Sequence, residues 1–237
     1  MTRWHGTTIN ASYWFSKSID FGSDYTVTGG GPERWRLAGQ SEFGVRQMEK
    51  GLSNFDQPHA LLVQGTWDTG RGGRNWTQRL YRGWEVSSVF LLKSGTPFTL
   101  DSGSDGPGFG NVDGTSGDRP HIVDPSLLGQ IVGNPDTAPL LLPRSAFRYM
   151  TAPREMAGNL GRNTFRKGKI ANLNASLGRS WALPRDWNVT LRAEAINLSN
   201  TPQFAEPGLS LTSANFGQIT NTLNDGRTFR FLLRLGF

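Results

Sequence analysis

The last eleven residues, Arg227–Phe237, read RTFRFLLRLGF and decide the fold. Large apolar side chains occupy every second position of this stretch: Phe229, Phe231, Leu233, Leu235 and Phe237. Successive side chains of a β-strand point to opposite faces, so the period predicts a strand with one wholly apolar face. An amphipathic strand of a soluble sandwich is the alternative. That alternative does not explain why the sequence stops on an apolar residue, since chain ends are usually loose and solvated.

The same alternation recurs in five other segments: Thr7–Ile19, His59–Asp68, Gly83–Lys93, Ile170–Leu183 and Asn188–Asn197. These segments are roughly 10–14 residues long, whereas strands of globular proteins are usually about 5–6 residues long. A tilted strand of about 9–11 residues crosses a bilayer. No segment has convincing helical periodicity. The sequence therefore predicts an all-β fold, an antiparallel up-and-down transmembrane β-barrel segment of about six long strands.

The connections between these strands alternate between long and short. The long ones are 20–58, 94–169 and 198–226, and the short ones are 69–82 and 184–187. Outer-membrane barrels have short periplasmic turns and long extracellular loops. We therefore expect the three long connections to be extracellular and the C-terminus to be periplasmic. Tryptophans lie near strand ends, where an interfacial girdle belongs, at Trp67, Trp84, Trp181 and Trp187.

About six strands are too few to close a barrel, because single-chain bacterial barrels begin at about eight strands. Membrane-spanning strands must close, since an open edge would leave backbone groups unpaired in lipid. We therefore expect an open curved sheet, an incomplete barrel, with residues 1–237 forming one portion of a larger structure. The pattern after Met1 has no apolar signal-peptide core. We therefore expect the chain to be a fragment of a larger barrel or a subunit of an oligomeric one.

Several short motifs occur in a characteristic order along the chain: Ser16–Asp20, Asn54–Asp56, Ser94–Thr99, Gly158–Asn163, Arg192–Asn200 and Asn215–Thr220. With these motifs the sequence resembles the C-terminal part of the barrel of TonB-dependent receptors, specifically the Oar-like group. The resemblance runs along nearly the whole chain. It implies a parent barrel of 22 strands with an N-terminal plug domain, of which this chain would be roughly the last quarter.

The resemblance implies a location in the cell outer membrane and, in the complete protein, energy-coupled uptake of a solute. It implies no catalysis and no cofactor. The partners it implies are outer-membrane lipid, the barrel-assembly machinery, the remainder of the barrel and plug, and TonB only through that plug. The alternation that ends at Phe237 resembles the signal by which the assembly machinery recognises outer-membrane proteins. An apolar-faced strand of this kind can also add to another sheet edge.

Two arginines and a glutamate lie on the polar faces of neighbouring strands, with a further arginine beyond them: Arg192, Glu194, Arg230 and Arg234. In a wide barrel this face looks into the lumen. Charge pairs between strands would suit a wall that contacts a plug. A hydrated lumen without a specific partner is an equal alternative. At the level of the whole chain, a soluble all-β binding module of carbohydrate type and a self-associating structural barrel also remain open.

Composition excludes several other classes. The chain has no cysteine, which removes disulfide scaffolds, and its three histidines lack metal-ligand spacing. The net charge of +6 is spread without a basic face, so no nucleic-acid partner is expected. The acidic, glycine-rich segment 101–118 does not match the spacing of a calcium loop. We expect this segment to be a solvated loop.

Overall fold

The computed structural model describes residues 2–4, 6–23, 50–70, 75–104, 118–149 and 158–237. Its main feature is a seven-stranded antiparallel sheet in the order β1-β2-β5-β6-β12-β13-β14. The strands of this sheet are β1 (Thr2–Trp4), β2 (Thr7–Phe15), β5 (His59–Asp68), β6 (Trp84–Lys93), β12 (Ile170–Ala182), β13 (Asn188–Ile196) and β14 (Thr228–Gly236). All six long strands expected from the alternation are present. They are 9–13 residues long, slightly shorter than expected.

The strand register joins the apolar stripes of neighbouring strands into one continuous face. Leu173 of β12 lies opposite Phe90 of β6, and Phe90 lies opposite Val63 of β5. On the other side of β12, Leu177 lies opposite Ala193, which faces Phe231 of β14. Ala11 of β2 lies opposite Val63. Because alternate side chains share a face, these pairs place the apolar positions of all six strands together. We call this surface the apolar face and the opposite surface the polar face.

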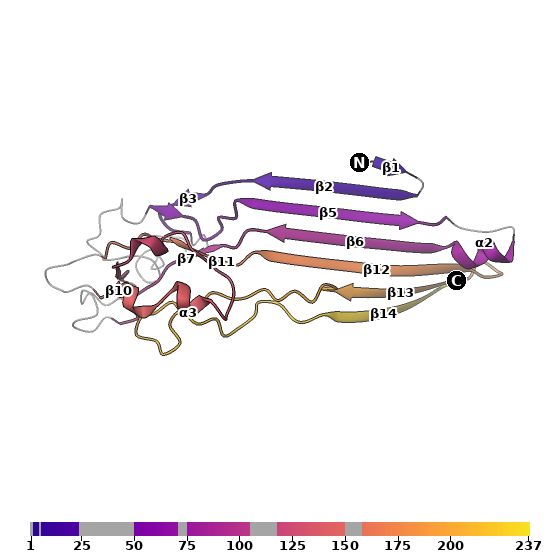
Figure 1. Ribbon diagram of the computed structural model, residues 1–237. Helices are drawn as coiled ribbons and strands as arrows, with labels where there is room; N and C mark the ends of the chain where they lie inside the picture. Colours follow the sequence, from indigo (N-terminus) through magenta and orange to yellow (C-terminus); the bar gives the residue numbers. More distant parts are fainter. Residues whose placement is uncertain (1, 5, 24–49, 71–74, 105–117, 150–157) are drawn as a thin grey trace.

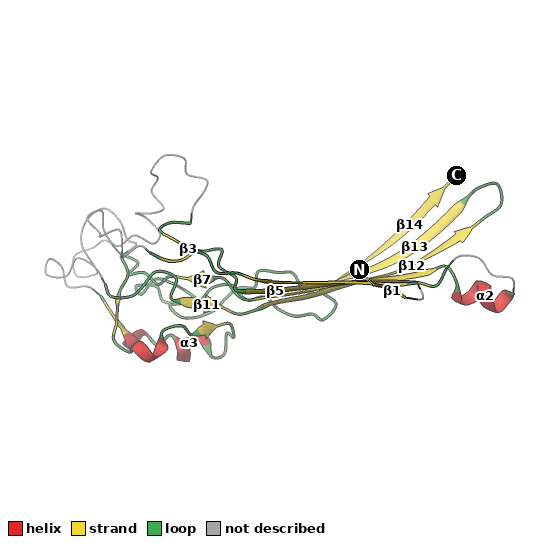
Figure 2. Cartoon of the chain, turned by 90° about the horizontal axis from the view of Figure 1, so that it is seen from above, coloured by secondary structure: helices red, strands yellow, loops and turns green. Residues whose placement is uncertain are grey.

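The sheet does not close on itself. Figures 1 and 2 show a long open sheet in which β12, β13 and β14 turn away from the plane of β2 and β5. Among the described residues, β14 pairs with β13 on one side and with no strand on the other. This confirms the expectation of an open segment of a barrel. No helix within the described part of the chain is long and apolar enough to span a membrane.

The short connections and the C-terminus lie together at one end of the sheet (Figure 1). The β12–β13 turn is tight, and its Arg185 and Asp186 have positive φ angles of 65° and 61°. Two such residues fit a turn whose twist matches the strands that it joins. The β5–β6 connection contains the helix α2 (Trp76–Tyr81), which the sequence pattern did not indicate. Six residues are too short for a helical period to stand out.

The described parts of the long connections gather at the opposite end and fold against one another (Figures 1 and 2). Their elements are β3 (Ile19–Asp20), β4 (Gly51–Leu52), β7 (Pro97–Phe98), β8 (His121–Ile122), η2 (Pro125–Leu127), β9 (Ile131–Val132), α3 (Ala138–Leu141), η3 (Arg144–Ala146), β10 (Phe147–Arg148) and β11 (Phe165–Lys167). Strand β11 lies between β7 and β9, antiparallel to the first and parallel to the second. We call the described residues of the three long connections the loop layer.

The hydrophobic core lies in the loop layer and not in the sheet. Among the described residues fourteen apolar side chains are buried, and of these only Ala195 lies on a long strand. The others form one cluster around Phe165, whose ring stacks on Phe98 at 5.9 Å and meets the edge of Phe147 at 6.2 Å. Burial of this kind is what stabilises a domain in water. The long connections therefore have a folded structure of their own.

Candidate functional site

Four of the five expected C-terminal apolar residues lie on the apolar face of an edge strand, and the fifth, Phe237, follows the last residue of that strand. Their side chains are Phe229, Phe231, Leu233, Leu235 and Phe237, all more than half exposed. Strand β14 is held by its pairing with β13 from Asn188↔Gly236 to Ile196↔Thr228. The period of two is therefore confirmed as a geometric fact. Recognition of this strand by an assembly machinery stays a prediction.

The polar face brings three of the four expected charges together. Arg192 and Glu194, two positions apart on β13, form an ion pair of 3.2 Å. Arg230 lies directly across from Glu194, with its Nε 4.0 Å from a carboxylate oxygen. Arg192 also donates to the Ser176 hydroxyl at 3.0 Å. These groups border a shallow hollow of about 320 Å³ on the polar face.

The fourth charge lies apart from this network. Arg234 sits opposite Thr190, and none of the ion pairs within the described residues includes it. Hydroxyls continue the polar face on both sides of the network. Ser87 bonds Ser176 at 2.6 Å, and Ser180 bonds Thr190 at 2.9 Å. Around β12 and β13 the polar face thus combines short hydroxyls with a charge cluster, an arrangement suited to water or to a polar contact surface.

Aromatic side chains mark both ends of the apolar face. At the loop-layer end, Tyr13 donates or accepts a hydrogen bond of 2.8 Å with His59, and the Phe15 ring lies 5.4 Å from the same imidazole. At the other end, Trp67 and Trp84 occupy the corresponding positions of β5 and β6. His59 and Trp67 are eight residues apart, or roughly 26 Å along the strand. At a tilt of about 40° this spans on the order of 20 Å of depth, to which the aromatic rows add their own width.

A buried polar network ties the first long connection to the second. Arg162 donates to the Asp20 carboxylate at 2.5 Å and to the Ser23 hydroxyl at 2.6 Å, and its side chain is almost completely buried. The Ser23 hydroxyl donates to the other Asp20 oxygen at 2.7 Å. Desolvation raises the pKa of Asp20, but the hydrogen bonds from Ser23 and Arg162 outweigh it, and the pKa lies below its ordinary value of 3.8. The carboxylate is therefore charged at neutral pH and holds Arg162 in place.

A second buried ion pair joins Asp56 to Arg166. Asp56 is 1% exposed, and its other oxygen accepts the backbone N–H of Ser18 at 2.7 Å. Arg166 donates further to the carbonyls of Asp56 at 3.0 Å and of Gly95 at 3.2 Å. Buried charges need such partners, because an unpaired one is costly to desolvate. The contact fixes the loop-layer end of β2 to β11.

Asn163 links the same two connections through its amide. It donates to the carbonyl of Leu52 at 2.6 Å and to the side chain of Asn54 at 2.7 Å, and accepts from the Thr99 hydroxyl at 2.9 Å. Gly95 allows the backbone of 94–99 to approach β11, since a Cβ there would lie 2.0 Å from the Lys167 carbonyl oxygen. The motifs Asn54–Asp56, Ser94–Thr99 and Gly158–Asn163 thus meet in space as contacts between loops.

The segment 101–118 differs from the expected solvated loop wherever the structure describes it. Asp118 is fully buried and Ser102 is 1% exposed. Burial raises the pKa of Asp101 above its ordinary value, against the hydrogen bonds from Ser210 and Gly103. The expectation was wrong for these ends, because the backbone of Asp101 pairs with 209–211 and the Ser102 N–H donates to the Asp118 carbonyl. Residues 105–117, with Asp105 and Asp113, lie outside the described residues, and the rest of the described chain shows no metal-binding cluster of three acidic or histidine side chains.

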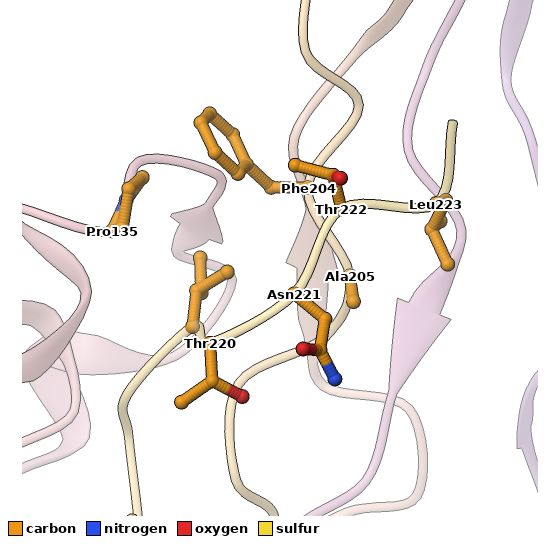
Figure 3. A pocket seen from close by; sticks show the side chains of 8 residues that line it. Pro135, Phe204, Ala205, Thr220, Asn221, Thr222 and Leu223 are labelled. Atoms are coloured by element: carbon orange, nitrogen blue, oxygen red, sulfur yellow. The ribbon is translucent and has the colours of Figure 1, made fainter. Parts of the chain in front are cut away.

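A second hollow, of about 650 Å³, opens on the loop layer. The Phe204 ring extends toward Pro135 across it, and Thr220, Asn221 and Thr222 line its side (Figure 3). The backbone of this wall is a pair of antiparallel segments in which Ala205 donates to the Asn221 carbonyl at 3.0 Å. The motif Asn215–Thr220 reaches the hollow at its last two residues, Ile219 and Thr220. The sequence pattern gave no signal for the hollow, because its residues are brought together by contacts between two connections.

Comparison with known proteins gives the family. A family model described as an outer membrane beta barrel domain matches residues 2–230, and the chain belongs to this family. Searches of curated proteins and of solved structures found no significant match. Membership implies a location in the outer membrane and a family whose usual roles are transport and structure, without catalysis.

Proposed function

We propose that this chain forms the C-terminal wall of a TonB-dependent receptor of the Oar-like group, which takes up a solute across the outer membrane with energy from the inner membrane. The observation that carries the proposal is the pairing of an open, lipid-suited sheet with a separately folded loop layer. A wide barrel needs both a long apolar band and rim loops that hold a shape above the pore. Several of the motifs that suggested the family supply residues that hold this loop layer together.

The polar face supports the same proposal. Arg192, Glu194 and Arg230 form a charge cluster on the wall that would face the lumen, next to the hydroxyls of Ser87 and Ser176. Such a cluster can bind the polar surface of a plug. The plug and the remaining strands come from the rest of the receptor, and TonB acts through that plug.

The apolar face disfavours a soluble binding module. A sandwich would bury this face under a second sheet, but the described strand pairs outside the main sheet are only two or three residues long. Phe231 and Leu233 remain 76% and 67% exposed. In water, an apolar surface of this extent would promote aggregation.

Cysteine labelling tests the proposal cleanly, because the chain has no cysteine of its own. Ser176→Cys and Leu177→Cys are neighbours on opposite faces of β12 and form a matched pair. In intact cells, a membrane-impermeant maleimide should label Ser176→Cys and leave Leu177→Cys unlabelled. Equal labelling of both would contradict the placement of the two faces.

Energy coupling is tested with the same variant. Labelling of Ser176→Cys should slow when a protonophore collapses the inner-membrane gradient, because a plug that is no longer moved shields the lumen. A rate that does not depend on the gradient would contradict a TonB-dependent receptor and leave a passive barrel.

The open sheet edges also favour a second candidate, a barrel assembled from several copies of this chain. Its two edge regions, β14 and the part of β2 beyond β1, could pair with those of neighbouring copies. Chemical cross-linking in native membranes distinguishes the two. A ladder of multiples of 26.1 kDa indicates copies, and a single larger partner polypeptide indicates the receptor.

A further inference from the structure

One charged side chain interrupts the apolar face. Among the described long-strand residues on that face, Arg179 is the one that carries a permanent charge. It lies directly opposite Trp84 of β6 and two positions from Trp181 on its own strand. Its guanidinium lies 4.9 Å from the Trp84 ring and 5.1 Å from the Trp181 ring. Two indole rings therefore hold the cation by cation–π contacts.

The position of Arg179 matches the depth of lipid headgroups. It lies three residues before the end of β12, in the aromatic row that includes Trp67 and Trp84. A charge at the centre of a bilayer is costly, whereas an arginine at the interface keeps its stem in hydrocarbon and its head at the surface. Indole rings prefer the same level. A planar guanidinium there can bind two oxygens of a phosphate at once.

Helix α2 adds a second interfacial feature at the same end of the sheet. Trp76 and Leu80 are four positions apart and share a side of the helix, and they are 78% and 64% exposed. The indole N–H of Trp84 donates to the Leu80 carbonyl at 3.2 Å. Thr69 bonds the Trp84 backbone N–H at 2.9 Å. Trp84 thus contacts both Arg179 and α2, and Figure 1 shows α2 beside the ends of these strands.

The aromatic row continues to the edge of the sheet. The Trp187 ring lies 5.7 Å from the Phe237 ring, so the β12–β13 turn and the C-terminus meet at this level. A short helix with exposed apolar side chains is suited to the boundary between headgroups and acyl chains. The row, the helix and the cation together form a surface that continues the lipid-facing apolar face.

We propose that this end of the sheet carries a binding site for the headgroup of an anionic phospholipid, in which Arg179 binds the phosphate between Trp84 and Trp181 while α2 lies in the headgroup layer beside it. The occupant is a lipid of the bilayer, because the apolar face continues without another charge up to Arg179. The inference rests on the membrane placement of the apolar face and does not depend on the proposed transport.

Lipid analysis of the protein extracted from outer membranes into polymer-bounded nanodiscs tests the site. The Arg179→Gln variant should retain about fivefold less phosphatidylglycerol per protein than the unchanged chain, since each basic group near an anionic surface contributes about that factor. Arg179→Lys keeps the charge without the planar stacking. It should retain an amount of phosphatidylglycerol between those of Arg179→Gln and the unchanged chain. Arg234→Gln removes the same charge from the polar face and is the matched control. Equal losses in Arg179→Gln and Arg234→Gln would overturn the proposal.

A second measurement uses the unchanged chain and so does not depend on a variant's folding. In liposomes, energy transfer from tryptophan to a dansyl-labelled phosphatidylglycerol should exceed transfer to a dansyl-labelled phosphatidylcholine. Millimolar glycerol phosphate should not remove the difference if the site holds a membrane lipid. Equal transfer to the two lipids would overturn the proposal, and competition by glycerol phosphate would show a site for free phosphate instead.

Discussion

The sheet and the loop layer of this chain treat apolar side chains differently: the loop layer buries them, and the sheet leaves them at least partly exposed. The loop layer has a closed apolar core around Phe165 and buried ion pairs at Asp20 and Asp56. The sheet has the longest strands and the most regular hydrogen bonding, yet all apolar side chains on its long strands except Ala195 are partly or fully exposed. The loop layer is built like a domain in water, and the sheet is built for a solvent that is itself apolar. The chain therefore combines a region that is stabilised as proteins are in water with a region that suits an apolar surrounding.

This contrast explains where the functional contacts lie. In the outer membrane the strand ladder satisfies the backbone groups of the sheet, so its side chains are not needed to hold the strands together. The loop layer must hold itself together, and its glycines, asparagines and arginines are used for that purpose. Changes in the two regions should accordingly differ in size.

The largest expected effect is at the centre of the loop layer. Phe165→Ala removes a fully buried ring and should lower the free energy of opening of the loop layer by about 3–5 kcal/mol. Hydrogen–deuterium exchange of the chain in nanodiscs measures this in peptides that cover 94–104 and 158–169. Phe231→Ala on the apolar face is the control and should change these peptides by less than about 1 kcal/mol. Similar losses of protection in Phe165→Ala and Phe231→Ala would contradict the difference between the loop layer and the sheet.

The next effect concerns the buried ion pair. Asp56→Asn leaves Arg166 without its carboxylate and should cost about 3 kcal/mol, measured by the same exchange. Glu206→Gln is the matched control, because its pair with Lys167 at 2.9 Å is half exposed and should contribute less than about 1 kcal/mol. An equal response would mean that burial does not set the strength of these pairs.

A smaller effect is expected from pH. The pKa of Asp20 is lower in the folded chain than its ordinary value of 3.8, so its contribution is present above that pH and is lost as the pH falls through the folded value. Asp101 has a raised pKa and acts in the opposite direction, favouring the fold as it takes up its proton. Exchange measured between about pH 2.5 and 6 should show loss of protection around 19–23 on acidification. Asp20→Asn should flatten that loss, and an unchanged profile would contradict the assignment.

The smallest effect is expected on the polar face. Arg230→Gln breaks a pair of 4.0 Å with Glu194 in which the arginine is 61% exposed, and should change sheet protection by less than about 0.5 kcal/mol. Arg234→Gln, which is outside the charge cluster, should do the same. A loss above about 1 kcal/mol in Arg230→Gln alone would show that the cluster stabilises the sheet.

The sequence determined the six long strands, their two faces and the end at which the short connections lie. This was possible because alternation is a local property: a residue's side of a strand follows from its position alone. Leu233 and Arg234 could be assigned to opposite faces without knowing any neighbour. The same locality explains why α2 was missed, since six residues hold too little of a helical period.

Only the tertiary structure decided the register, the charge cluster and the loop layer. The register between β13 and β14 places Arg230 opposite Glu194 and Arg234 opposite Thr190. Arg162 meets Asp20 across 142 positions of sequence, and Asp101 pairs with Ser210, which follows it much later. Contacts of this kind depend on how distant segments pack, which no local pattern encodes. Alternation along each strand therefore predicts the long sheet, whereas the loop layer follows only from long-range packing.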